Sequence, residues 1–149
     1  MPEKETLERA RKDKREGKSP STQAGEFVRE EIEHVREGKH GARSTKQAIA
    51  IGLSKARRAG VDLPASKGSS EETKEQAARD RRKAKSGKRP SAKRSRATRK
   101  ALKREGHSAA SKEALSRQAR SAAKKRSAAS RSRSAKKAAA TRKKATKGT

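Results

Sequence analysis

The sequence predicts a mostly α-helical protein with extensive disorder, in which a small helical module is followed by a disordered basic tail. Two observations lead to this prediction. Large apolar residues are concentrated in the first 64 of the 149 positions, and only Leu102 and Leu115 lie beyond them. Residues 81–149 hold 27 of the 45 Lys and Arg residues but only 2 of the 17 acidic ones. A segment so rich in charge and poor in apolar side chains is not expected to bury enough surface to offset the entropy of ordering.

The apolar residues of the first part predict a small α-helical module at residues 1–64. Residues 22–37 carry an apolar stripe at helical spacing, and residues 45–59 carry a second one. The two segments are expected to form an antiparallel helical hairpin. Residues 3–16 form a marginal helix with acidic residues first and basic residues last, which would extend the hairpin to three helices.

Helix-start signals support both segments of the hairpin. Ser21 or Thr22 is expected to cap the first helix, after a turn at positions 19–21. Ser44 and Gln47 form a capping-box pattern at the start of the second helix. In this pattern, each of the two side chains accepts a hydrogen bond from the backbone N–H of the other residue. One face of the second helix carries small residues that allow a close approach to the first helix, namely Ala48, Gly52 and Ala56.

Beyond Pro64 the composition changes to that of a linker and a basic tail. Residues 65–82 are expected to be a linker that contains a short polar helix. Residues 83–149 are expected to be a disordered or transiently helical polycationic tail. Within it, residues 112–126 are expected to form a helix transiently and residues 127–149 to be coil. Good helix formers predominate there, but no face can bury much apolar surface.

The tail predicts nucleic-acid binding without sequence preference, with duplex DNA as the main candidate and an architectural or nucleoid-associated role in the cytoplasm. Each Lys or Arg that neutralises a phosphate releases condensed counterions, whatever the base sequence. Duplex targets are favoured because Phe27 is the only aromatic residue, so unpaired bases have no stacking platform. The expected contacts are Arg81, Arg82, Lys83, Lys85, Lys88, Arg89, Lys93, Arg94, Arg96, Arg99, Lys100, Lys103, Arg104, Arg117, Arg120, Lys124, Lys125, Arg126, Arg131, Arg133, Lys136, Lys137, Arg142, Lys143 and Lys144.

Three other interpretations of the chain remain open at the level of sequence. One is an RNA-binding or ribosome-associated basic protein. A second is a protein-interaction module, in which the net acidic helix at residues 22–37 binds a partner and the tail only solubilises or localises the chain. The third is sequence-specific DNA binding by a helix-turn-helix, which the long connection between residues 38 and 44 disfavours.

The loop between the two confident helices is a candidate phosphate clamp. Glycine residues precede a helix N-terminus there, and backbone N–H groups at such a terminus attract anions. Lys39, Arg43 and Lys46 would add positive charge. The alternative, which we favour, is that the glycines only end one helix and turn the chain into the next.

Several classes of function are not expected. The three histidines, His34, His40 and His107, have no cysteine and no clustered carboxylate facing them in the sequence, so we expect no metal site and no cofactor. His34 is expected to pack beside Phe27. The serines lie among cations without an Asp/His pattern, so no enzyme is expected. No apolar run near the N-terminus indicates a signal peptide or a membrane span.

Part of the chain resembles a known family. The stretches Ala24–Glu31, His34–Gly41 and Lys46–Gly60 are similar to a family of small basic bacterial proteins with a domain of unknown function, and Ser108–Arg126 resembles tails of the same family. This resemblance implies no activity and no site residues. Ala135–Lys147 is similar in composition to the Lys/Ala-rich tails of histone-H1-like proteins, which implies DNA binding, although such tails usually contain proline.

Overall fold

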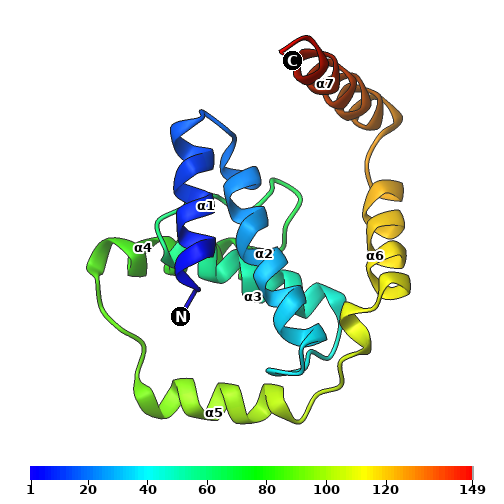
Figure 1. Cartoon of the computed structure of the whole chain (residues 1–149). Helices are drawn as coiled ribbons and strands as arrows, with labels where there is room; N and C mark the ends of the chain where they lie inside the picture. Colours follow the sequence, from blue (N-terminus) through cyan, green and yellow to red (C-terminus); the bar gives the residue numbers. More distant parts are fainter. Residues whose placement is uncertain (149) are drawn as a thin grey trace. The chain divides into compact units, whose positions relative to one another are not determined.

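The computed structural model describes residues 1–148, and its secondary structure over that range is entirely helical. The chain divides into two compact units, Met1–Ser111 and a second unit that begins at Lys112. None of the helices in the described range is long and apolar enough to cross a membrane. The helices, labelled in Figure 1, are α1 (Lys4–Arg15), α2 (Pro20–Arg36), α3 (Thr45–Arg58), α4 (Glu71–Ser86), α5 (Ala92–Lys103), the 3-10 turn η1 (Ser108–Ala110), α6 (Lys112–Lys124) and α7 (Ala128–Lys147).

The predicted extensive disorder of residues 83–149 is wrong, because α5, α6 and α7 occupy most of that segment. None of these three helices has a buried residue. They form through local signals instead: Ala, Lys and Arg have high helix propensity, and no proline follows Pro90. Ser91 and Ser127 cap α5 and α7 by accepting hydrogen bonds from the backbone N–H three residues on. Apolar burial, on which the prediction of disorder depended, was therefore the wrong criterion for these helices.

The start of α2 differs from the predicted one. Positions 19–21 were expected to form a turn, but Ser19 is the N-cap and its hydroxyl accepts from the N–H of Thr22. Pro20 occupies the first helical position, where its missing N–H costs nothing and its fixed φ suits the helix. The predicted Ser44 cap of α3 is confirmed, with Ser44 Oγ 3.2 Å from the N atom of Gln47.

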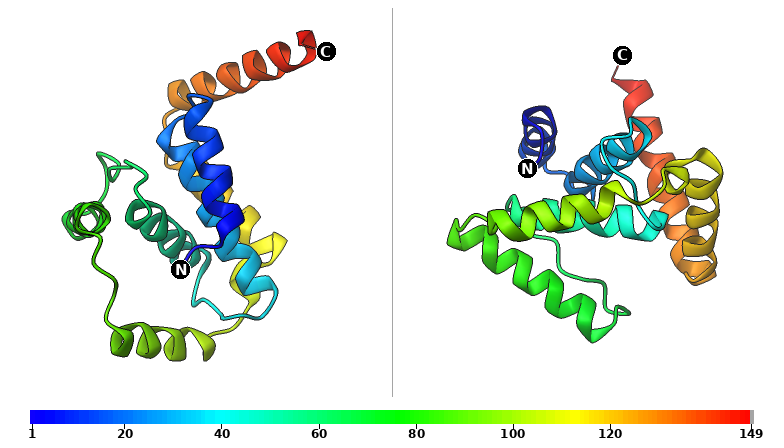
Figure 2. Two further views of the ribbon diagram at one scale, coloured as in Figure 1. Left: turned by 60° about the vertical axis from the view of Figure 1, so that its left-hand side comes forward. Right: turned by 90° about the horizontal axis from the view of Figure 1, so that it is seen from below.

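The hairpin of α2 and α3 is held by a close backbone approach at Gly52. A Cβ atom on Gly52 would lie 2.6 Å from the Cα of Val28, so only glycine fits between the two helices. Ala48 and Ala56 are fully buried on the same face of α3. The predicted close approach through small residues is confirmed. On another side of α2, α1 lies antiparallel to it (Figures 1 and 2).

The apolar core between α1, α2 and α3 is small. Phe27, expected only at the edge of the α2 stripe, is 1% exposed and is the largest buried side chain. The residues buried around it are mostly alanines, with Leu7, Leu53 and Leu63 packed at its margin: Ala10, Ala24, Ala56 and Val61. Short side chains can fill such a core only where the helix backbones approach closely.

Unit 1 extends beyond the predicted module of residues 1–64. Helix α4 packs on α3, and its Asp80 is completely buried there. Downstream, η1 packs against α2 and α3. The hydroxyl of Thr45 donates to the carbonyl of Ala109 at 2.6 Å, and Arg36 donates to the carbonyl of Ala110 at 2.8 Å. The segment that follows α5 is therefore anchored to the helical hairpin.

We predict that Gly52→Ala lowers the free energy of unfolding of unit 1 by about 1–3 kcal/mol, because the added methyl group forces α2 and α3 apart. The measurement is urea unfolding of the full chain, followed by the amide NMR signals of α2 and α3. These signals report unit 1 separately from the exposed helices α6 and α7.

The matched control is Gly25→Ala. Gly25 also lies inside a helix, but a Cβ atom there would meet nothing within 4 Å. This substitution is expected to raise the free energy of unfolding by about 1 kcal/mol, since alanine is the better helix former. Equal effects of the two substitutions would contradict the close contact at Gly52.

Candidate functional site

Half of the 18 Lys and Arg residues at positions 1–80 form ion pairs with carboxylates of the same unit. Several of these pairs join different helices or join a helix to a loop, so part of the positive charge is neutralised inside the fold. The cross-element pairs are Arg9–Glu26 at 2.7 Å, Lys18–Asp13 at 2.7 Å, Lys39–Glu3 at 3.1 Å, Arg58–Asp80 at 2.9 Å, Lys55–Glu31 and Arg81–Asp62.

The pairing also changes the titration of the groups involved. Hydrogen bonds from His34 and then Lys39 lower the pKa of the Glu3 carboxyl. The same contact with Glu3, and a second one with Glu37, raises the pKa of Lys39. Both groups are therefore held in their charged forms at neutral pH.

The Lys and Arg side chains from Arg82 to Lys147 behave differently. All of them are exposed, and none forms an ion pair with a carboxylate within the described residues. They include every predicted phosphate contact except Arg81, which is partly buried and pairs with Asp62. Lys112 and Lys147 share these properties although they were not predicted as contacts. The charge asymmetry seen in the sequence is thus also an asymmetry between paired and unpaired cations.

Helical geometry gathers most of the free cations of α5 and α7 on one face of each helix, with Arg94, Arg131 and Arg142 lying off these faces. At about 100° per residue, each set below spans an arc of about 120°. The set on α5 consists of Lys93, Arg96, Arg99, Lys100 and Lys103. The set on α7, which we call the α7 basic face, consists of Arg133, Lys136, Lys137, Lys143, Lys144 and Lys147.

The predicted phosphate clamp between α2 and α3 has few amides left to bind an anion. The N–H of Gly41 donates to the carbonyl of Leu102 at 2.9 Å, and the N–H of Ala42 donates to Gly106 at 3.0 Å. The N–H of Arg43 donates to the side chain of Gln47. Among the clamp cations, Lys39 pairs with Glu3 and Glu37, Arg43 lies 3.8 Å from Glu105, and Lys46 is exposed. This loop holds the end of α5 instead.

Residues 11–67 match a family of unknown function (DUF6496). The match agrees with the resemblance to an uncharacterised family and covers α2, α3 and the C-terminal end of α1 from Arg11 onward. Comparisons with curated proteins and with solved structures found no match. The basic helices α5, α6 and α7, and the stretch Ser108–Arg126, lie outside the DUF6496 match.

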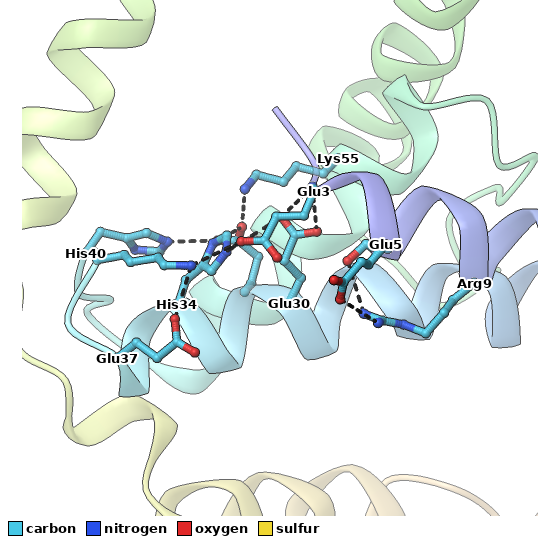
Figure 3. A network of polar contacts seen from close by, with 11 residues as sticks. Glu3, Glu5, Arg9, Glu30, His34, Glu37, His40 and Lys55 are labelled. Atoms are coloured by element: carbon cyan, nitrogen blue, oxygen red, sulfur yellow. Dashed lines mark hydrogen bonds and ion pairs between the residues drawn. The ribbon is translucent and has the colours of Figure 1, made fainter.

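Inside the DUF6496 region lies a cluster of charged side chains around the buried carboxylate of Glu31. Glu31 is 0% exposed and pairs with Lys55 of α3. His34 Nδ1 lies 3.7 Å from Glu31 Oε1, and His40 Nε2 lies 3.1 Å from Glu31 Oε2. Figure 3 shows the side chains of His34, His40 and Lys55 pointing toward one another. Glu3 contacts the Nε2 atom of His34. We call Glu31, His34 and His40 the Glu/His cluster.

The sequence did not reveal this cluster. His34 was expected to pack beside Phe27, but its ring contacts the carboxylates of Glu3 and Glu31. The premise that no carboxylate faces the histidines is also wrong. The available signal was the spacing of Glu31 and His34, which lie three positions apart on one helix and so share a face. His40 joins them only because the chain turns back after Gly38, whose φ is +75°.

A second buried carboxylate, Asp80, joins α4 to α3. It accepts hydrogen bonds from Ser54 at 2.6 Å and Arg58 at 2.9 Å, and from Gln76 of its own helix. Burial by itself raises the pKa of Asp80, but the hydrogen bonds from Ser54, Arg58 and Gln76 outweigh it, so the pKa lies below its ordinary value. The charged form is therefore favoured by folding.

We predict that Asp80→Asn lowers the free energy of unfolding of unit 1 at pH 6 by about 1–3 kcal/mol, because one of the two acceptor oxygens becomes an NH2 donor and Arg58 loses its counter-charge. A lowered folded-state pKa means that this contribution is complete above the unfolded-state pKa of about 3.9. It is lost as the pH falls through the lower folded-state value. Urea unfolding at several pH values should therefore show the difference between wild type and variant shrinking in acid.

The matched control is Asp62→Asn. The side chain of Asp62 is 76% exposed and pairs with Arg81 at the surface. Exposed pairs contribute little to stability, so the control should be close to wild type at every pH. A difference for Asp80→Asn that stays constant from neutral pH to acid would contradict the assigned role of its charge.

Proposed function

We propose that the chain binds duplex nucleic acid, with DNA as the main candidate, through the unpaired cations of α5, α6 and α7 and without preference for base sequence. The observation that carries this proposal is the exposure of every Lys and Arg side chain from Arg82 to Lys147, none of which pairs with a carboxylate of residues 1–148. Such side chains are free to replace the counterions condensed on phosphates, and that gain does not depend on the bases.

The helical form of the basic segments supports phosphate contacts along a duplex. Helix α7 has 20 residues and is therefore about 30 Å long, close to the roughly 34 Å of one turn of duplex DNA. Its basic face can follow the phosphates over that length. The helix is already ordered in the free chain, so binding needs no additional ordering of its backbone.

Single-stranded targets and sequence readout have less support. Phe27, the only aromatic residue, is buried, so no aromatic platform is available for unpaired bases. Lysines make up half or more of the basic sets on α5 and α7, and they contact phosphates as point charges. The chain would then act as an architectural, nucleoid-associated protein, in keeping with the histone-like composition of its C-terminal segment.

Docking of a protein partner through α2 has less support than nucleic-acid binding. α1, α3 and η1 all pack against α2. Its acidic side chains are engaged inside unit 1: Glu30 is buried and accepts from the N–H of Glu3, and Glu26 pairs with Arg9. Little of the acidic face is left for another molecule.

We predict a steep salt dependence of DNA binding by the full chain. If about 8–15 phosphates are engaged, the slope of log K against log salt is roughly −7 to −13. Replacing Lys136, Lys137, Lys143, Lys144 and Lys147 by Gln should make the slope shallower by about 3–5, because each lost phosphate contact removes about one. Fluorescence anisotropy with duplexes of two unrelated sequences measures both quantities.

The matched control replaces the same five lysines by Arg, which keeps the charge and the helix propensity. This variant should bind with the slope of the wild type. A wild-type slope near −2, or a strong preference for one of the two duplexes, would refute the proposal. Competition with structured RNA at fixed salt decides between DNA and RNA as the target.

A further inference from the structure

The geometry points to a binding site for one divalent metal ion of the zinc class, formed by the Glu/His cluster. One ligand atom each from Glu31, His34 and His40 lies within 4.8 Å of the other two. Two of these residues are three positions apart on α2, and the third comes from the following loop (Figure 3). This site lies in a different part of the chain from the basic helices, and metal binding there does not depend on nucleic-acid binding.

The hydrogen bonds of the two imidazole rings direct their lone pairs toward Glu31. His40 Nδ1 lies 2.9 Å from the carbonyl oxygen of Gly41, which only accepts, so this nitrogen carries the hydrogen. His34 Nε2 lies 3.0 Å from a carboxylate oxygen of Glu3 and carries the hydrogen of that ring. In the neutral rings, His40 Nε2 and His34 Nδ1 therefore carry the lone pairs. Metal-binding histidines have this arrangement, in which the second nitrogen donates to a carbonyl or carboxylate.

Glu31 supplies an oxygen that lacks a hydrogen-bond partner. The Oε1 atom of Glu31 accepts from Lys55, whereas Oε2 is buried and has no donor among the described residues. His40 Nε2 lies 3.1 Å from Oε2. With neutral rings, two nitrogen lone pairs and a carboxylate oxygen thus face one another. A cation between them would satisfy all three.

The ligand types select the class of ion. Two imidazole nitrogens and one carboxylate oxygen suit Zn²⁺ and the neighbouring transition metals, whereas Ca²⁺ and Mg²⁺ prefer oxygen ligands alone. A tetrahedral ion at about 2 Å from its ligands needs them about 3.3 Å apart. The distance between His40 Nε2 and Glu31 Oε2 is already 3.1 Å. Small side-chain rotations would bring His34 Nδ1 within ligand distance of the same ion. Water would take the fourth position.

An ion at this site would stabilise the loop that carries the end of α5. His40 is followed by Gly41 and Ala42, whose N–H groups hold the carbonyls of Leu102 and Gly106. A Cβ atom on Gly41 would lie 2.0 Å from the carbonyl oxygen of Glu105, so the backbone segments around these two residues are in close contact. The metal would join α2 to this loop directly.

The test is calorimetric titration of Zn²⁺ into the untagged, chelator-treated full chain. We expect one ion per chain. His40→Gln should weaken binding at least tenfold, because it removes a ligand. The control is His107→Gln, which removes an exposed histidine outside the Glu/His cluster and should leave the affinity unchanged. Titration with Co²⁺ should give visible absorption of a four-coordinate site in the wild type and lose it in His40→Gln.

Two further variants keep the test decisive if His40→Gln fails to fold. Glu3 is half-exposed, and Glu3→Ala should weaken Zn²⁺ binding about tenfold by removing the acceptor that orients His34. Lys55→Gln removes the competing cation from Glu31 and should tighten Zn²⁺ binding. Absence of stoichiometric binding, or equal affinities in His40→Gln and His107→Gln, would overturn the proposal and leave the cluster as an internal ion pair only.

Discussion

The contact of Gly52 with the backbone of Val28 is the constraint on which the N-terminal unit depends. A chain with one aromatic residue and few large aliphatic ones can form a core only if its helices approach closely enough for alanines to fill the space. The same crossing places the rest of α3. Lys55, one turn after Gly52, reaches the buried carboxylate of Glu31 on α2. Ser54 and Arg58 reach the buried carboxylate of Asp80 on α4. Both buried charges are thus compensated from one helix.

Charge is used in two different ways along the chain. In the first part, carboxylates and cations are paired across elements and help to hold a fold that has little apolar surface. In the second part, the cations are exposed and have no carboxylate partner among residues 1–148, and helices α5, α6 and α7, which carry most of them, contain no buried residue. Helix α5 combines the two: it carries unpaired cations but belongs to unit 1. Its C-terminal end is held by hydrogen bonds from the loop after α2. A basic helix is in this way held by a module in which half of the cations before position 81 are paired with carboxylates.

Much of the local structure could be predicted because local signals decide it. The helices at residues 3–16, 22–37 and 45–59 and the close approach at Gly52 were all predictable from periodicity, caps and side-chain size. The disorder of residues 83–149 was predicted wrongly because the absence of an apolar face was weighted above helix propensity and the Ser caps. The start of α2 was missed by two residues because Ser19-Pro20 was interpreted as a turn, although Pro suits the first position of a helix.

The sequence by itself determined where the first three helices lie, that the cations lie mainly in the second half, and that the core is small. Only the tertiary structure decided which distant residues meet. Thr45 and Ala109 are 64 positions apart, and Ser54 and Asp80 are 26 apart, yet they form hydrogen bonds. The Glu/His cluster likewise needs the turn at Gly38 to return His40 to α2. Such contacts depend on the paths of the connecting loops, which are set by the packing of the whole unit, and no periodicity or composition in the sequence encodes those paths directly.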